Sequence, residues 1–152
     1  MSDARLLDVV LGYLRAQAWP VEALPGDGEA ITRYPGRHAT WRCLVRTREA
    51  ERQLAFYSEA PTTVPRERRP AVMEFVARAN QDMVLGNFEL DVDTGAVRFK
   101  TSVAVGPSGL TLEVLRPLVH ANVLTMDQYL PGLVAVVEGR HSPEEACALC
   151  EA

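Results

Sequence analysis

The most regular alternation of apolar and charged residues runs from Gly86 to Lys100 and predicts a β-hairpin. Apolar and charged positions alternate on both sides of an Asp-Thr-Gly turn, which is the period of strands solvated on one face. Facing apolar residues with apolar ones, and acids with bases, selects one register. Its predicted pairs are Val92 with Val97, Asp91 with Arg98, Leu90 with Phe99 and Glu89 with Lys100. The charges are therefore interpreted as cross-strand pairs.

Three further strands are predicted ahead of this hairpin. They cover residues 29–34, 40–47 and 52–58, where apolar and polar residues alternate over short runs. Residues 19–27 contain two prolines and are interpreted as a loop, and residues 60–65 as a break before the next helix. The short connection between the second and third of these strands favours a hairpin or meander.

Helical spacing of apolar residues predicts three helices. They run over residues 4–17, from about Pro70 to near Met83, and from a cap at Thr111 to Gly139. Within the third helix, the segment 125–129 either bends the chain or lets it run straight on.

Capping chemistry predicts where two helices begin. Asp3 is expected to cap the first helix. A final helix is expected after Ser142, because Ser142 can cap, Pro143 suits the first helical position and Glu145 completes a capping box.

These segments form one predicted domain over residues 1–152, in the order α-βββ-α-ββ-αα(α). The strands follow one another in groups instead of alternating with helices. This order is typical of an α+β fold with an antiparallel sheet and helices packed on one face.

Composition narrows the class of protein. The 152 residues carry a net charge of -4, which argues against a nucleic-acid partner because phosphate binding needs a basic surface. The acidic start does not resemble a signal peptide, and no apolar run is long enough to span a bilayer. Three cysteines give no disulfide framework, so we expect a protein of the reducing cytoplasm.

Cys147 and Cys150 form a Cys-x-x-Cys pair near the end of the last predicted helix. A redox role would need a helix N-terminus, where the helix dipole lowers a thiol pKa. A zinc site would need two ligands besides the cysteines, and only His141 is close in sequence. We interpret the pair as a surface or half-buried feature of the helix, with metal and redox roles as alternatives.

No catalytic motif is recognisable. The histidines His38, His120 and His141 are scattered, and the sequence holds no nucleophile elbow, zinc-protease motif or phosphate-binding loop. We therefore expect no enzyme activity and no catalytic, cofactor-binding or metal-binding residues.

Two polar features need their own interpretation. The basic residues Arg66, Arg68 and Arg69 precede the second helix, where cations are poorly placed for the helix dipole. They form either a solvated loop or a docking patch for an acidic protein segment or a phosphate. Asn80 near the end of that helix is interpreted as a cap or a side-chain bond to the adjoining strand, with ligand binding as the alternative.

Several short motifs follow one another in a fixed order along the chain. They are Phe-Val-Ala-Arg-Ala-Asn at 75–80, Leu-Gly-Asn-Phe-Glu-Leu-Asp at 85–91, Asp-Thr-Gly-Ala-Val-Arg-Phe at 93–99, Asp-Gln-Tyr-Leu-Pro at 127–131 and Ser-Pro-Glu-Glu-Ala at 142–146, together with Arg69 and Gly139. Their order resembles that of the YbjN domain family, labelled as candidate bacterial sensory transduction regulators. The chain resembles this family over about residues 4–147. The resemblance implies a fold similar to type III secretion chaperones, and no established enzyme activity, cofactor or catalytic residue.

Two hypotheses about function follow. The first is a non-enzymatic regulatory or chaperone-like domain in bacterial stress or signal-transduction responses, which binds a protein or peptide partner and forms a homodimer. The alternative is a small-ligand sensor or enzyme with a pocket between sheet and helices. Such a pocket would bring together polar groups such as Asn80, Arg98 or His120.

Overall fold

The computed structural model describes residues 4–152 as a six-stranded antiparallel sheet with four α-helices. The helices are α1 (Leu6–Ala16), α2 (Arg69–Asn80), α3 (Leu112–Val137) and α4 (Pro143–Glu151), with a 3-10 turn, η1 (Arg66–Arg68). The strands are β1 (Val21–Ala23), β2 (Glu29–Pro35), β3 (Thr40–Arg48), β4 (Gln53–Thr63), β5 (Asn87–Leu90) and β6 (Ala96–Ala104). They lie in the order β1-β2-β3-β4-β6-β5. The predicted α+β class is confirmed.

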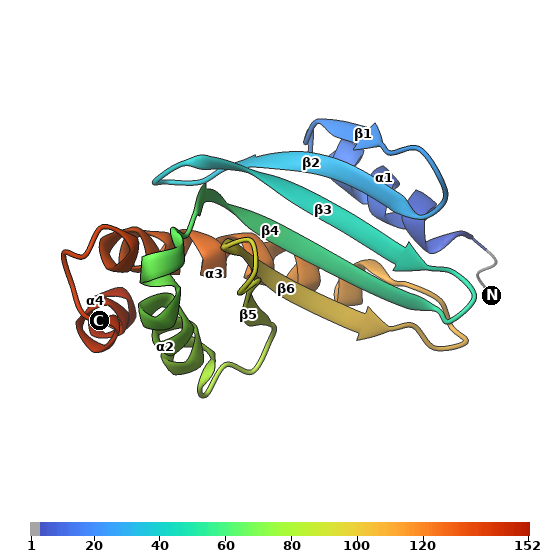
Figure 1. Ribbon diagram of the computed structural model, residues 1–152. Coiled ribbons are helices and arrows are strands. Elements are labelled where there is room, and N and C mark those ends of the chain that lie inside the picture. Colours follow the sequence, from blue (N-terminus) through green and yellow to red (C-terminus); the bar gives the residue numbers. More distant parts are fainter. Residues whose placement is uncertain (1–3) are drawn as a thin grey trace.

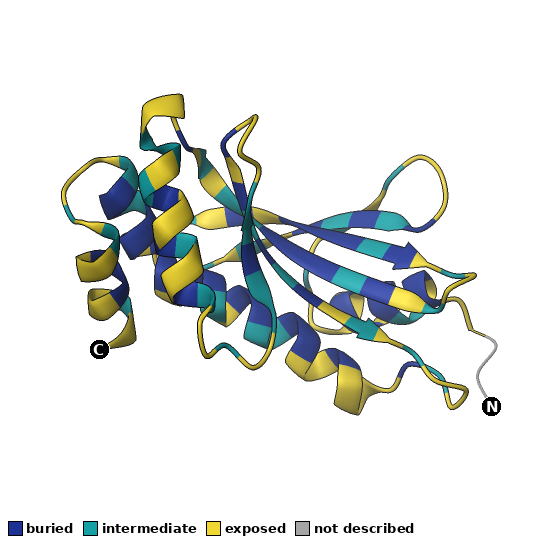
Figure 2. Cartoon of the chain, turned by 60° about the horizontal axis from the view of Figure 1, so that its bottom comes forward, coloured by how far each residue is buried: buried dark blue, intermediate teal, exposed yellow. Residues whose placement is uncertain are grey.

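The sheet has one covered face and one open face. In Figure 1 the open face is toward the reader, α1 and α3 lie behind the sheet, and α2 and α4 lie at one end. Figure 2 shows buried residues interspersed with intermediate and exposed ones along the strands, with more consecutive buried residues in the central strands β3 and β4. The large inward side chains Phe56, Phe99, Leu115 and Met126 are fully buried between sheet and helices. One continuous core therefore holds the two layers together.

Two boundaries differ from the predicted strands. The predicted loop 19–27 contains β1, whose three residues pair with β2 but are too few to show a periodic pattern. β4 continues to Thr63 through the predicted break. The pairing of β4 with β6 shifts between Glu59 and Thr63, and at such an irregularity Pro61 need not supply a ladder N–H.

The predicted hairpin exists, but its register was wrong by two residues. Glu89 lies opposite Arg98 and Leu90 opposite Val97. The turn is longer than predicted because the Asp91 carboxylate accepts the backbone N–H groups of Asp93 and Thr94. A shift of two keeps every side chain on its predicted face.

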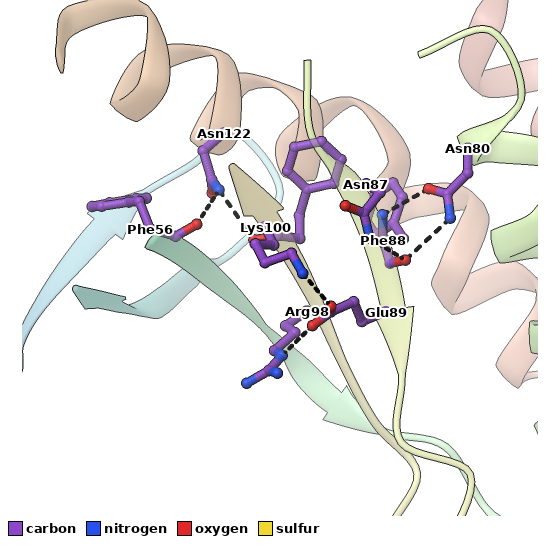
Figure 3. A network of polar contacts seen from close by, with 9 residues as sticks. Phe56, Asn80, Asn87, Phe88, Glu89, Arg98, Lys100 and Asn122 are labelled. Atoms are coloured by element: carbon purple, nitrogen blue, oxygen red, sulfur yellow. Dashed lines mark hydrogen bonds and ion pairs between the residues drawn. The ribbon is translucent and has the colours of Figure 1, made fainter. Parts of the chain in front are cut away.

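This turn also changes two predicted contacts. Val92 belongs to the turn and is 52% exposed, so it does not extend the apolar face. Asp91 does not pair with Arg98, whose Nε donates to Glu89 Oε1 at 2.7 Å. The predicted contact of Glu89 with Lys100 does form, with Lys100 Nζ at 2.8 Å from Glu89 Oε2 (Figure 3).

The predicted helix caps are present, apart from that at Asp3, which lies outside the described residues. The Thr111 hydroxyl accepts the N–H of Val114, and Ser142 and Glu145 form the expected capping box. α3 is one continuous helix through the segment 125–129, where the sequence had left open whether the chain bends or runs on.

α2 ends at Asn80, three residues before the predicted end near Met83. Asn80 Nδ2 donates to the carbonyl of Phe88 at 3.1 Å, and Asn80 Oδ1 accepts the N–H of Phe88 at 2.7 Å (Figure 3). The predicted side-chain bond to the adjoining strand is therefore confirmed. Asn80 also occupies backbone groups of the edge strand β5 that an added strand would need.

Asn122 fastens α3 to the centre of the sheet. Its fully buried Nδ2 donates to the carbonyl of Phe56 on β4 at 2.8 Å and to that of Phe99 on β6 at 3.0 Å (Figure 3). The hydroxyl of Thr101 on β6 donates in turn to the carbonyl of Leu118 on α3 at 2.7 Å. Polar bonds in both directions thus fix the position of α3 along the strands.

We expect Asn122→Ala to lower the free energy of unfolding by about 1–3 kcal/mol, because it removes buried hydrogen bonds at the centre of the domain. Urea denaturation followed by circular dichroism measures the change. Arg116→Ala, at an exposed position of the same helix, is the matched control and should change stability by less than about 0.5 kcal/mol. Equal effects of the two substitutions would contradict the assigned role of Asn122.

Candidate functional site

A groove of about 500 Å³ runs between α3, α4 and the turn that joins β2 to β3. Its apolar lining comes from the two helices: Leu124, Pro131, Gly132, Ala135, Ala146 and Leu149. Leu124 is 57% exposed and Leu149 is 61% exposed, although both are large apolar side chains. The groove therefore leaves apolar surface open to solvent.

The groove depends on the close approach of α4 to α3. Gly132 makes this possible, because a Cβ there would lie 2.6 Å from Cys150 Sγ and 3.0 Å from a ring carbon of Phe75. Gln128 on α3 donates to the carbonyl of Cys150 at 3.0 Å and so holds the last turn of α4. The Ser142 capping box fixes where α4 begins.

A buried carboxylate positions the third wall. Asp127 Oδ1 accepts the backbone N–H of Arg37 at 2.9 Å and lies 3.4 Å from His38 Nδ1. Gly36 is required beside it, because a Cβ at this position would lie 2.7 Å from Asp127 Oδ1 and closer still to the Trp41 ring. Asp127 therefore ties the β2–β3 turn to α3.

The rim of the groove is basic. Arg37 and His38 stand on one side, and Arg140 and His141 on the other. The Arg140 Nε donates to Glu138 at 2.8 Å, and its remaining N–H groups donate to none of residues 4–152. Apolar walls with cationic edges suit a ligand that combines apolar groups with carboxylates.

The basic residues Arg66, Arg68 and Arg69 have unequal surroundings. Arg68 donates through Nε and Nη2 to the carbonyl of Val136, at the C-terminus of α3, where a cation is favourable. Arg69 donates to the carbonyls of Val64 and Asp93 and braces the hairpin turn. Arg66 is exposed. Two of the three side chains thus have internal roles, and a docking role for the run stays a prediction.

The sequence profile of one family, with the description "Putative bacterial sensory transduction regulator", matches residues 6–134. The chain belongs to the YbjN family. A solved structure agrees in fold: the "Crystal structure of YbjN, a putative transcription regulator from E. coli" aligns with a TM-score of 0.56 and 11% identity, over 88% of this chain and 90% of that chain. No curated protein matches the chain significantly. The family resemblance predicted from the short motifs is confirmed.

The Cys-x-x-Cys pair of this YbjN-family chain lies at the end of α4, as predicted, with Cys150 half-buried in the lining of the groove. Cys147 is buried and its Sγ lies 3.5 Å from the carbonyl of Phe75. Burial raises the pKa of the Cys147 thiol to about 11 and also raises that of Cys150. Among residues 4–152, no three or more His, Cys, Asp or Glu side chains are grouped to hold a metal ion.

The polar groups of the alternative hypothesis do not meet in one pocket. Asn80 is bound to Phe88, and Arg98 lies on the open face of the sheet against Glu89. His120 Nε2 lies 2.7 Å from the hydroxyl of Tyr13, and burial together with the charge of Arg116 lowers the pKa of His120. Each group therefore serves a separate local contact in this YbjN domain.

Sequence reasoning missed the groove and Asp127. The available signal was an acid placed on the apolar side of a long helix, next to Met126 and near Val123 and Leu130. Among the described helices of this YbjN-family chain, none combines the length and the apolar character needed to cross a membrane.

We expect Cys150 to react first with Ellman's reagent at pH 8, and Cys43 and Cys147 to react only on unfolding. Burial raises the pKa of Cys43 to about 12 and that of Cys147 to about 11, so roughly 0.1% or less of either thiol is ionised at pH 8. Cys150→Ser should abolish the fast phase of labelling. A fast phase that persists in this variant would show a reactive Cys147 and revive the redox interpretation.

Proposed function

We propose that this chain is a non-enzymatic regulatory domain that acts by binding another protein through the groove between α3 and α4. The proposal rests on one observation: the same groove combines two exposed leucines, Leu124 and Leu149, with a basic rim formed by Arg37 and Arg140. The YbjN family description, which names a regulator and no reaction, supports it.

The chemistry of the groove defines the partner segment. Apolar side chains of the partner would pack against Leu124 and Leu149, and Asp or Glu side chains beside them would face the basic rim. A short amphipathic helix with an acidic border combines both properties in one segment. We propose such a segment as the occupant.

Strand addition is the less favoured way to bind. Asn80 already holds the backbone of Phe88 on the edge strand β5, so an incoming strand would have to displace these bonds. The opposite edge is β1, which has only three residues, Val21–Ala23. Docking into the helix groove needs neither edge.

A homodimer and a likeness to type III secretion chaperones belong to the same proposal. Chaperones of that kind work as dimers and wrap partner segments, which would place two grooves in one assembly. Light scattering on the purified chain tests the dimer directly. A mass equal to one chain would remove the dimer and leave groove binding intact.

A photo-cross-linking experiment tests the groove. Leu124 is replaced by p-benzoylphenylalanine in the native host, cross-linked chains are isolated, and the attached peptide is sequenced by mass spectrometry. We expect a segment of a second protein that carries both apolar and acidic residues. Leu112, 53% exposed on the same helix but outside the groove, is the matched control and should give little product.

Charge-reversal variants provide the second readout. We expect Arg37→Glu and Arg140→Glu to reduce capture of the same partner by at least about fivefold, because each loses an attraction worth about 1 kcal/mol. Arg66→Glu tests the predicted docking run in the same assay. Equal cross-linking from Leu112 and Leu124, or a captured segment without acidic residues, would contradict groove binding.

A further inference from the structure

The open face of the sheet carries a second hollow, of about 580 Å³, over strands β3, β4 and β6. Its floor consists of small side chains, because Ala55 of β4 lies opposite Ser102 of β6 and Ala104 follows two residues later. Gln53 and Ser102 add an amide and a hydroxyl to the lining. The floor is thus low and offers hydrogen-bonding groups.

Cations stand on both sides of this floor. Arg46 and Arg48 come from β3 and Lys100 from β6, with β4 between them. Since neighbouring strands lie about 4.8 Å apart, these two strands are roughly 10 Å apart. Arg46 forms an ion pair with Glu29, and Lys100 forms one with Glu89. Arg48, in contrast, makes no ion pair with any of residues 4–152. The hollow therefore retains unused positive charge.

The open face as a whole is basic in an acidic protein. Of the chain's 16 basic and 20 acidic residues, six basic and four acidic lie on this face of strands β1 to β6. The basic residues are Arg33, Arg42, Arg46, Arg48, Arg98 and Lys100, and the acidic residues are Glu22, Glu29, Glu59 and Glu89. Its charge attracts anions and opposes stacking against a second copy of the same face.

Two buried side chains of the open face argue against stacked nucleic-acid bases and against a hydrophobic protein as its ligand. The ring of Tyr57 lies under the guanidinium groups of Arg98, 4.2 Å from the ring centroid, and Arg46, at 5.5 Å. It is nearly buried and is not a free platform for stacking bases. Leu44 is buried beside it, so little apolar surface remains for a hydrophobic partner.

We propose that this hollow binds a small molecule that carries two or more linked phosphate groups. One phosphate can reach the β3 arginines or Lys100, whereas a chain of phosphates spans the floor between them and contacts both sides. Guanidinium groups suit phosphate oxygens because they offer several N–H donors in one plane. Gln53 and Ser102 supply further donors from the floor.

Titration calorimetry with inorganic tripolyphosphate, at a constant ionic strength near 0.15 M, tests the proposal. We expect saturable binding at one site, at least about tenfold tighter than for inorganic phosphate. Arg48→Ala should weaken it at least about tenfold, since it removes a charge-assisted contact. Ser102→Glu, which places a carboxylate on the floor, should abolish it.

Arg33→Ala is the matched control, because Arg33 is an exposed arginine of the same face outside the hollow. It should leave the affinity within about twofold. Amide chemical-shift changes on titration should centre on Ala55, Ser102 and Ala104. Equal weakening by Arg33→Ala and Arg48→Ala, equal affinity for phosphate and tripolyphosphate, or no saturation by about 1 mM would each overturn the proposal.

Discussion

The attachment of α3 to the two central strands is the constraint on which the rest of the domain depends. Asn122 bonds the carbonyls of Phe56 and Phe99, so one buried amide fixes a 26-residue helix to both β4 and β6. A buried N–H donor that loses its partners is costly, so the loss of these bonds opposes a shift of α3 along the strands. From that position α3 presents Asp127 to the β2–β3 turn and Gly132 to α4. The groove is a consequence of where α3 is held.

The apolar side chains on the two faces of the sheet are shielded from solvent in different ways. The inner face is covered by α1 and α3 (Figure 1). On the open face, away from α1 and α3, Tyr57 is nearly buried because the side chains of Arg46 and Arg98 lie over its ring. Long cationic side chains can cover apolar surface and still leave their charge in water. The open face is therefore stable without a partner and keeps a positive field.

Features governed by neighbouring residues were predictable from the sequence. The caps at Thr111 and Ser142 require only a short polar side chain followed by helix-forming residues, and both are present. The hairpin register was predictable only to within two residues, because alternation of period two does not distinguish such shifts. The bonds from Asp91 to the backbone of the turn decided between them. The residues that line the groove lie between Arg37 and Cys150 in the chain. Asp127 indicates the groove only when the position of α3 is known, so the sequence alone did not predict it.

The basic run before α2 shows why charge in sequence and charge on a surface differ. Arg68 binds the carbonyl of Val136 and Arg69 that of Asp93, since a guanidinium can satisfy carbonyls that helix ends and turns leave free. These bonds use N–H donors that a ligand would need. The basic rim of the groove is instead assembled from Arg37 and Arg140, which are 103 residues apart in the chain. The packing of α3, α4 and the β2–β3 turn brings this basic rim together, and the rim does not correspond to a run of basic residues in the sequence.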